Sequence, residues 1–397
     1  MNAVLSSPEV RADPVLRIKG KALLPIVQGG MGVGISAHRL AGHVARAGAV
    51  GTLSSVDLRR HHPDLMLQTA KSRDKELINR VNLLALDREI HAALEIAAGN
   101  GLIAVNIMRA VSEYANNVRQ SCESGAQAIV VGAGLPLDLP DLTAGYPDVA
   151  LIPILSDSRG IAIVLKKWLR KSRLPDAVII EHPRYAGGHL GAAKIEDLDD
   201  PRFDFPRVLE ETFEVFKQLG IERENLPLIP AGGISTPAQV HELFALGASA
   251  VQIGTPFAVT EESDAHPNFK RVLAEAKPED IVTFMSVAGL PARAVKTPWL
   301  EKYMVKLPAL QRRADPRADC TLAFDCLEQC GLRDGIARFG QFCIDHHLAA
   351  ALAGDVERGL FFRGAAPLPF GKHIRPVKDL IAYLLEGKMP TDLSPAV

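Results

Sequence analysis

The chain has 397 residues, with 45 lysine and arginine residues against 46 aspartate and glutamate residues. Apolar residues make up 47% and charged residues 23%, a composition that excludes a disordered chain or a coiled coil. The near-zero net charge argues against a nucleic-acid partner, because nucleic-acid binders attract phosphates with a basic surface. We therefore expect the chain to bind a small molecule.

The sequence shows no membrane or export segment. No apolar run approaches the roughly 20 residues that span a bilayer. Residues 1–17 include four charged side chains and no apolar stretch of signal-peptide length. We expect a cytoplasmic protein without a membrane partner, whose five cysteines are thiols or metal ligands rather than disulfides.

Short β-branched runs alternate with longer helical patterns, which is typical of parallel βα units. The predicted strands are Leu24–Val27, Ala49–Leu53, Leu102–Asn106, Ala128–Val131, Leu151–Ile154, Ala177–Ile180, Leu228–Pro230 and Ala250–Ile253. The predicted helices between them are Ala37–Ala47, Asp87–Ala98, Val111–Ser121 and Pro237–Leu246, the last capped by Thr236. Eight strands in about 230 residues favour an α/β fold, a TIM (βα)8 barrel, over an open sheet.

The pattern changes after residue 300. Strand-like runs stop, and helices are predicted at Asp325–Gly354 and Val377–Glu386. The chain is therefore expected to comprise an N-terminal arm (1–20), a barrel (21–300) and a helical extension packed on the barrel (301–397). The extension is expected either to cover the site or to form a contact in a homodimer.

Three glycine-rich loops follow predicted strands, at residues 28–34, 186–191 and 231–235, and Gly254-Thr255 follows the last strand. Glycine lets the backbone approach a ligand closely, and free backbone N–H groups at such turns attract anions. In barrels, the turns after the seventh and eighth strands commonly bind phosphate. A cofactor that carries a phosphate is therefore expected at residues 231–235 and 254–255.

Two other interpretations of these loops are open. Residues 32–37 match the G-x-G-x-x-G/A fingerprint of dinucleotide-binding folds, and Asp57 lies 20 residues beyond Ala37, where such folds bind a ribose. That interpretation leaves the other two glycine loops unexplained. The loops could also be tight turns without any ligand, although three of them at strand ends, where barrel sites are built, favour a site.

The combined motifs resemble a known family. Residues 28–31, 186–191, 231–235, 252–257 and 262–268 are similar to the nitronate monooxygenases, formerly called 2-nitropropane dioxygenases, and to the related flavin-dependent enoyl-ACP reductases. The resemblance spans residues 20–300 and implies a barrel that binds FMN at the carboxyl ends of its strands. The cofactor-binding residues that it implies are Gln28, Gly29, Gly30, Met31, Asn106, Gly187, Gly188, Ala231, Gly232, Gly233, Gly254 and Thr255. From the residues alone, Asn106 could equally be a turn-forming asparagine.

His189 is the expected catalytic residue. The resemblance places it beside the reactive face of the flavin as a base or substrate ligand, and an imidazole can accept a proton at cytoplasmic pH. Ser286 is a candidate for the substrate side of the site, and an ordinary turn serine is the alternative. The expected reaction oxidises a nitronate or nitroalkane with O2 to a carbonyl compound and nitrite.

Four of the five cysteines fall close together in the extension, at Cys320, Cys326, Cys330 and Cys343. Four thiolates can hold zinc or an iron–sulfur cluster, so a metal centre is one candidate role. The alternatives are buried structural thiols, which the helical spacing of Cys326 and Cys330 favours, and redox sensing.

Two further functions compete with a nitronate monooxygenase. The chain could be a flavin reductase that uses NAD(P)H to reduce an enoyl thioester or a quinone. It could also be a flavin- or nucleotide-binding regulatory protein without catalytic activity, because one barrel fold supports many functions.

Overall fold

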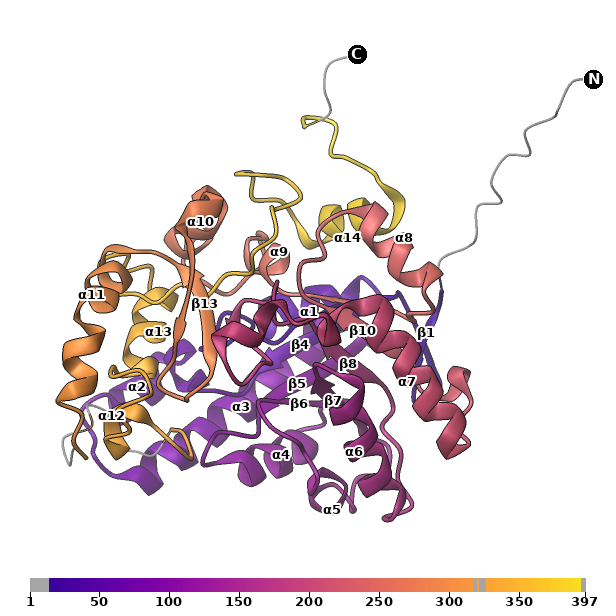
Figure 1. Ribbon diagram of the computed structural model, residues 1–397, viewed down its shortest axis with the longest axis horizontal. Helices are drawn as coiled ribbons and strands as arrows, with labels where there is room; N and C mark the ends of the chain where they lie inside the picture. Colours follow the sequence, from indigo (N-terminus) through magenta and orange to yellow (C-terminus); the bar gives the residue numbers. More distant parts are fainter. Residues whose placement is uncertain (1–13, 317–319, 321–325, 394–397) are drawn as a thin grey trace, which may run out of the picture.

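The computed structural model describes residues 14–316, 320 and 326–393. Eight parallel strands close into a barrel in the order β10-β11-β3-β4-β5-β6-β7-β8, which confirms the predicted TIM barrel (Figure 1). They are β3 (Ile26–Gln28), β4 (Val50–Ser54), β5 (Leu102–Met108), β6 (Ala128–Gly132), β7 (Ala150–Leu155), β8 (Val178–Glu181), β10 (Leu228–Ala231) and β11 (Val251–Ile253). Every predicted strand is therefore confirmed, with its ends within two residues of the prediction.

The closed sheet shows that the dinucleotide-binding alternative is wrong, because that fold needs an open sheet. Asp57, its predicted ribose ligand, is buried and forms ion pairs with Arg59 and Arg60. Arg60 also binds Asp345 at 2.7 Å, so this carboxylate cluster joins the loop after β4 to the C-terminal part of the chain.

Helices surround the barrel. In chain order they are α1 (His38–Arg46), η1 (Leu58–His61), α2 (Pro63–Thr69), α3 (Lys75–Ala97), α4 (Tyr114–Glu123), α5 (Leu139–Leu142), α6 (Ser158–Leu169), η2 (Ile195–Asp199), η3 (Pro201–Phe203), α7 (Phe205–Leu219), η4 (Arg223–Asn225), α8 (Pro237–Ala245), α9 (Thr255–Ala258) and α10 (Pro267–Glu275). The four predicted barrel helices are confirmed. Thr236 caps α8 in a capping box with Gln239. α3 starts 12 residues before the predicted Asp87, because Asp74 caps it by accepting the N–H of Leu77.

The last helix of the chain, α14 (Val377–Glu386), completes the outer ring. The helix that directly follows β11 is the four-residue α9, which is too short to cover the outer face between α8 and α1. α14 lies against both of these helices, and Figure 1 shows it beside α8. Leu380 and Leu384 of α14 are fully buried in one apolar cluster with Leu40 of α1 and Val240 of α8. The predicted helix Val377–Glu386 is thus confirmed and belongs to the barrel's own packing.

One loop caps two of these helices. The Asp264 carboxylate accepts backbone N–H groups of Ala37, Arg39 and Leu40 at the start of α1, at 2.9–3.1 Å. Glu262, from the same loop, accepts the N–H of Val377 at the start of α14. Since both helices lack a capping side chain of their own, these carboxylates satisfy otherwise unpaired N–H groups.

A second sheet stands beside the barrel. Its strands are β12 (Ile281–Met285), β13 (Pro291–Val295) and the two-residue β9 (Gly188–His189), in the antiparallel order β12-β13-β9. None of these strands was predicted. The β-branched run at β12 and the turn at Gly289, where φ is +73°, were the available signals. A further hairpin, β1 (Leu16–Ile18) and β2 (Lys21–Leu23), packs its apolar side chains into the interior cluster of the barrel.

The predicted helix Asp325–Gly354 is wrong. Within its described part, only α12 (Gly331–Asp334) and α13 (Ile344–Leu352) are α-helical. α12 ends at Gly335, where φ is +66°, because glycine takes this left-handed conformation without strain. α11 (Pro298–Arg312), which was not predicted, precedes them. The division of the chain at residues 20 and 300 and the homodimer stay predictions, and residues 1–13 and 325 lie outside the described residues. None of the described helices is long and apolar enough to cross a membrane.

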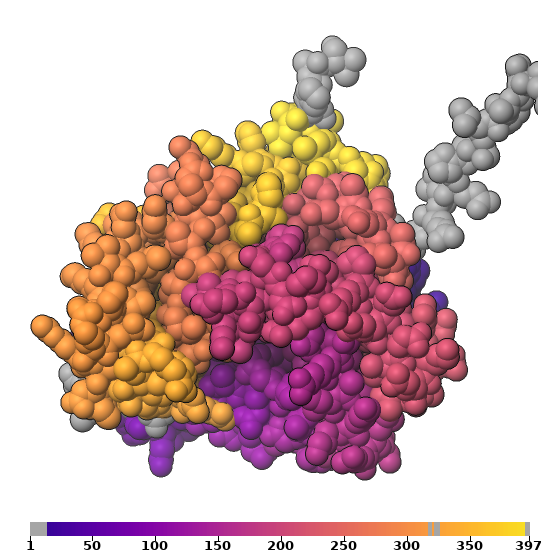
Figure 2. Space-filling view, in the orientation of Figure 1, coloured from indigo at the N-terminus to yellow at the C-terminus, as the bar shows by residue number. Residues whose placement is uncertain are grey.

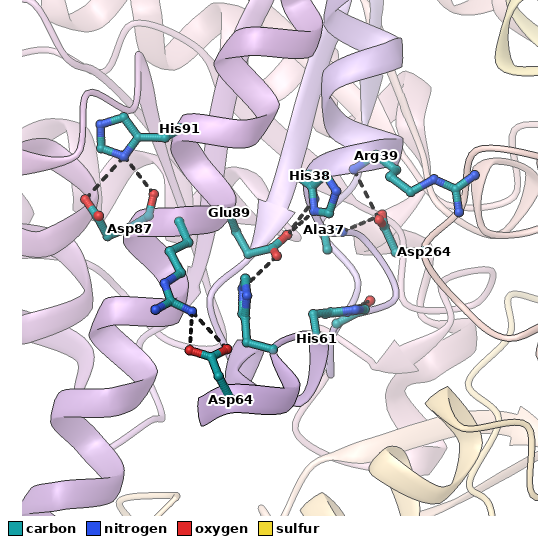
Figure 3. Close-up of polar contacts among 12 residues, drawn as sticks. Ala37, His38, Arg39, His61, Asp64, Asp87, Glu89, His91 and Asp264 are labelled. Carbon is teal, nitrogen blue, oxygen red and sulfur yellow. Dashed lines mark hydrogen bonds and ion pairs between the residues drawn. The ribbon is translucent and has the colours of Figure 1, made fainter. Parts of the chain in front are cut away.

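A buried carboxylate, Glu89 of α3, joins α1 to the segment before α2 (Figure 3). Glu89 is 1% exposed. Its oxygens lie 2.8 Å from His38 Nδ1 and 3.0 Å from His62 Nε2, and it also accepts the backbone N–H of His38. The hydrogen bonds from the two histidines lower the pKa of Glu89 to about 2 despite its burial, and the hydrogen bond to Glu89 raises the pKa of His38.

We predict that Glu89→Gln destabilises the protein by about 3–5 kcal/mol, as expected when a buried ion pair loses one partner. The pKa of Glu89 is lowered, so its stabilisation is present above about pH 4.5 and is lost as the pH falls toward 2. The pKa of His38 is raised, so its contribution is complete below about pH 6.5 and is lost at higher pH. Denaturant unfolding should therefore show the largest difference from wild type between about pH 4.5 and 6.5.

The matched control is Asp64→Asn. Asp64 also pairs with a cation, Arg88, but its side chain is 57% exposed, so we expect no measurable change in stability. Equal effects of the two substitutions would contradict the role assigned to Glu89.

Candidate functional site

The carboxyl ends of the barrel strands form the floor of a cavity of about 640 Å³. Side chains alternate along each strand between the barrel interior and the surrounding helices. At or just beyond the carboxyl end of every strand, an inward-facing residue lines the cavity. These residues are Gly29, Ser54, Asn106, Gly132, Ile154, Glu181, Ala231 and Gln252. Asn106 therefore points into the cavity from within β5 and is not a turn residue.

The structure brings the three predicted glycine loops to this one cavity. The predicted cofactor residues that line it are Gly29, Gly30, Met31, Asn106, Gly187, Gly188, Ala231, Gly232, Gly233, Gly254 and Thr255. Gln28 is the exception. Its buried amide accepts the N–H of Thr52 and donates to the Thr52 carbonyl, so it holds β3 to β4, where one residue pair alone defines the strand register.

The turns after β10 and β11 have the properties of an anion site. Gly232 and Gly233 have φ of +103° and +77°, which turns the backbone sharply at the cavity edge. The backbone N–H groups of Gly233, Ile234 and Gly254 donate no hydrogen bond to any described residue. Unpaired N–H groups on a concave surface attract an oxyanion such as a phosphate.

Close packing explains two of the other glycines. A Cβ atom at Gly30 would overlap the Cβ atom of Asn106. At Gly187 it would lie 2.6 Å from the backbone of Arg363 and Gly364. These glycines therefore allow the loops to lie against neighbouring segments of the chain.

His189 reaches the cavity because its strand is held from outside the barrel. β9 pairs with β13, with Ala292 opposite His189, and the same hairpin places Ser286 directly after β12. His189 Nε2 lies 2.9 Å from Ser286 Oγ, although 97 residues separate them in sequence. Ser286 is fully buried and does not line the cavity, so its hydroxyl touches His189 rather than the cavity space.

The protonation state of His189 follows from its surroundings. Burial lowers its pKa to about 4, and no charged group opposes this effect. The imidazole is therefore neutral at pH 7. One ring nitrogen faces the Ser286 hydroxyl, which also accepts the N–H of Ala288 at 3.1 Å.

Arg293 of β13 fixes the loop before His189. Its side chain is 7% exposed, and its guanidinium donates to the carbonyls of Pro183 and Ala186 at 3.2 and 2.5 Å. Both hydrogen bonds come from Nη1, so one nitrogen joins the two carbonyls of the loop. Arg293 is therefore a buried side chain that holds two backbone carbonyls of this loop.

The C-terminal part of the chain forms the roof of the cavity. Phe362 bridges to Ala294 of β13, and its ring centroid lies 5.7 Å from that of His189. Gly364 donates its N–H to Thr255 Oγ1 at 3.0 Å, and Ala365 donates to the carbonyl of Tyr185. In Figure 2 the orange and yellow C-terminal residues border the magenta residues after β8.

Several cavity residues were not predicted. Glu181 ends β8 on the same face as Ala177 and Ile179, and this alternation at the carboxyl end of a strand was the available signal. Phe362 and Asp345 come from the C-terminal part of the chain. Their distance in sequence from the barrel motifs left no pattern that could have indicated them.

The cysteines do not support a metal site. None of Cys320, Cys326, Cys330 and Cys343 forms a disulfide. Among the residues that the structure describes, no group of three or more His, Cys, Asp or Glu side chains is arranged to hold a metal ion. Burial raises the pKa of Cys326 and of Cys330, which disfavours the thiolate form that metals bind. The predicted iron–sulfur or zinc centre therefore has no structural support.

Comparison with known proteins agrees with this architecture. The family model for nitronate monooxygenase matches residues 16–387, nearly the whole chain. The chain belongs to the nitronate monooxygenase family. It is 27% identical to a probable nitronate monooxygenase of Bacillus subtilis over 289 residues, which cover 70% of this chain and 78% of the relative. A probable nitronate monooxygenase of Staphylococcus saprophyticus is 26% identical over 293 residues, covering 70% and 77%.

Solved structures share the fold. FabK from Thermotoga maritima superposes with a TM-score of 0.62 at 24% identity and covers 91% of each chain. A nitroalkane oxidase from Streptomyces ansochromogenes superposes with a TM-score of 0.60 at 20% identity, covering 92% of this chain and 96% of its own. These structures show the fold, and the family match confirms the predicted class, a flavin-dependent monooxygenase.

The cavity fits a flavin. It combines a floor with the polar side chains of Ser54, Asn106 and Gln252, an edge of unpaired N–H groups, and mostly apolar walls. A flavin that carries a phosphate fits such a cavity. Its phosphate requires hydrogen-bond donors, and its ring requires an apolar surface with a few polar groups.

We predict that Gly30→Ala reduces flavin binding and stability, because the added methyl group would collide with Asn106 on the cavity floor. An overpacked site costs about 1–3 kcal/mol, which should appear in thermal unfolding alongside a lower flavin content of the purified protein.

Gly145→Ala is the control for this variant. A Cβ atom at Gly145 would meet no atom within 4 Å, so flavin content and stability should match wild type. Full flavin occupancy in the Gly30→Ala variant would show that the loop can move away from Asn106.

Proposed function

We propose that the chain oxidises nitronates and nitroalkanes with O2, using FMN, to give a carbonyl compound and nitrite. The observation that carries this proposal is the placement of His189, supported by Ser286, in the same cavity as the turns after β10 and β11. One end of the cavity suits a phosphate, and the other presents a neutral hydrogen-bonding group to a small substrate.

FMN, rather than a larger flavin, agrees with the anion site. The N–H groups of Gly233, Ile234 and Gly254 would hold its phosphate, and Asn106 would contact the polar edge of the ring from the floor. Thr255 Oγ1 already accepts the N–H of Gly364 but can still donate its own proton to a phosphate oxygen. Bound flavin would supply electron transfer from substrate to O2, which no side chain provides.

His189 acts as a substrate ligand. With a pKa of about 4 the imidazole stays neutral at pH 7, so it offers a hydrogen bond to a nitro oxygen but is a weak base. The Ser286 hydroxyl holds the opposite ring nitrogen and sets the direction of the imidazole. Phe362 and the C-terminal roof exclude water, which strengthens a hydrogen bond to the charged nitronate.

Anaerobic titration of the flavin-loaded protein tests the proposed function. Propyl-2-nitronate should bleach the visible flavin band, because the substrate supplies the electrons. NADH and NADPH, added separately, should leave the band unchanged over the same time.

Each other result has a defined meaning. Rapid bleaching by NADH or NADPH alone would favour a flavin reductase of an enoyl thioester or quinone. A colourless protein that takes up no FMN would exclude both oxidoreductase functions.

We predict that His189→Asn lowers kcat for propyl-2-nitronate about 10²–10³-fold, the usual cost of removing one preorganised hydrogen-bond group from a charged reacting centre. Flavin content should not change, because the substitution leaves the N–H groups of Gly233, Ile234 and Gly254 in place to hold the phosphate.

His43→Asn is the matched histidine control. His43 lies on α1 and its ring bonds the carbonyl of Arg39, one turn earlier in the same helix, so turnover should equal that of wild type. An equal loss in both variants would indicate a general effect on folding.

A further inference from the structure

We propose that the preferred substrate is a nitronate with a neutral, linear aliphatic tail of several carbons, and that an apolar wall opposite the phosphate turns binds this tail. This inference rests on the proposed function and adds the class of substrate that the cavity selects. It concerns the part of the substrate that does not react.

The wall lies across the barrel from the phosphate turns. In the closed strand order, β10 lies opposite β5, with three strands between them on either side. The loops after β4 and β5 and the C-terminal part of the chain supply the apolar side chains of this wall. We call the following residues the far wall: Val56, Met108, Val111, Leu327, Ile344 and Leu348.

The far wall is one continuous apolar surface. All of its side chains belong to a single apolar cluster, into which Phe362 also packs. Val111 and Leu327 form an antiparallel bridge, and the N–H of Glu328 donates to the carbonyl of Ala110 at 2.8 Å. These backbone contacts hold the C-terminal part of the chain against the loop after β5.

The far wall leaves apolar surface exposed to the cavity. Val56, Met108 and Leu348 pack against the cluster but are only half-buried, and all three line the cavity. Apolar surface of this kind gains free energy when an apolar ligand displaces the water that covers it. An aliphatic group is therefore the chemical class that fits this wall.

Phe362 joins the far wall to the reacting end of the cavity. Its ring centroid lies 5.7 Å from that of His189, and the same side chain packs against the apolar cluster of the far wall. A substrate whose nitro group is bound by His189 can therefore lay its carbon chain along Phe362 toward the far wall.

The charges around the cavity disfavour an anionic tail. Among the lining residues that the structure describes there is no lysine or arginine, whereas Asp157, Glu181 and Asp345 are carboxylic acids. Asp345 follows Ile344 of the far wall and binds Arg60 at 2.7 Å through Oδ2. A carboxylate tail would lose its hydration here without a cation on the cavity surface to pair with, which is unfavourable. The tail that fits is therefore neutral.

Oxidation of a series of primary nitronates in air tests the inference on wild type. The series is ethylnitronate, butyl-1-nitronate and hexyl-1-nitronate. We expect kcat/KM to rise about fourfold for each added methylene, the usual gain from burying this group, and about 10²-fold from ethyl to hexyl. A kcat/KM that is independent of chain length, or that falls with it, would overturn the inference.

A charged analogue tests the neutrality of the tail. The nitronate of 6-nitrohexanoate has as many carbons as hexyl-1-nitronate but ends in a carboxylate. Its kcat/KM should be lower by about 10²-fold or more, because an ion that leaves water without a partner is strongly disfavoured. Equal values for the two substrates would show that the tail stays in solvent, against the inference.

Leu348→Trp places a larger side chain in the space of the tail. The ratio of kcat/KM for hexyl-1-nitronate to kcat/KM for ethylnitronate should fall by about tenfold or more, as expected when about two methylenes lose their contacts. This ratio compares two substrates in one protein, so it does not depend on the fraction of folded enzyme. An unchanged ratio would overturn the inference. So would a loss of bound flavin, which would assign the far wall to the flavin ring.

Leu94→Trp is the matched control. Leu94 of α3 is also half-buried and packs against the same cluster, but it does not line the cavity. This variant should keep the wild-type ratio. An equal fall of the ratio in both variants would contradict the role assigned to the far wall.

Binding of inert amides separates this inference from the proposed function. Acetamide and hexanamide carry a neutral carbonyl group in place of the nitro group and are not substrates for this oxidation. Titrated into the flavin-loaded protein and followed by the change in the flavin spectrum, hexanamide should bind about 10²-fold more tightly than acetamide.

The two failures then differ. Preferential binding of hexanamide by a protein that oxidises no nitronate would refute the proposed function and support the tail site. Oxidation of nitronates together with equal binding of the two amides would overturn the inference and leave the proposed function in place.

Discussion

Closure of a parallel sheet is the constraint on which the rest of this structure depends. Because all eight strands run the same way, their carboxyl ends meet at one end of the barrel, and the loops that follow them meet there too. Residues as distant in sequence as Gly29, Asn106 and Gln252 become neighbours on one floor for this reason. Unpaired N–H groups after β10 and β11 then form one edge of the same cavity.

Removal from water, rather than charge pairing, sets the chemistry inside the cavity. Burial moves the pKa values of His189 and Glu181 in opposite directions, because it disfavours the charged form of each. The imidazole is therefore neutral at pH 7, and the carboxyl is only partly ionised there. Outside the cavity, Glu89 shows the contrasting case, in which two histidine partners overcome the same burial.

The C-terminal part of the chain is necessary to the barrel in two ways. α14 fills the position of the eighth outer helix, which the short α9 leaves open. The segment from Phe362 to Ala365 closes the cavity through contacts with Thr255 and Tyr185. A further sheet, β12-β13-β9, holds His189 from outside the barrel. The cavity end of the barrel therefore depends on residues that follow the last barrel strand.

Local sequence patterns were sufficient to predict the strands, the barrel and the glycine turns. The alternation of apolar residues, the positions of glycines and the N-capping residues are properties of a few neighbouring residues. The helix predicted at Asp325–Gly354 failed where Gly335 ends α12. The missed strands β12 and β13 pair with each other, and β13 pairs with β9, rather than with a barrel strand. The sequence by itself determined the barrel, the family and most cavity-lining glycines. Only the tertiary structure decided that Ser286 contacts His189 and that the Gln28 side chain bonds to the backbone of Thr52 in β4. It also decided that Glu181 faces the cavity. Those contacts join residues far apart in sequence, and burial, which sets their charge, exists only once the chain has folded.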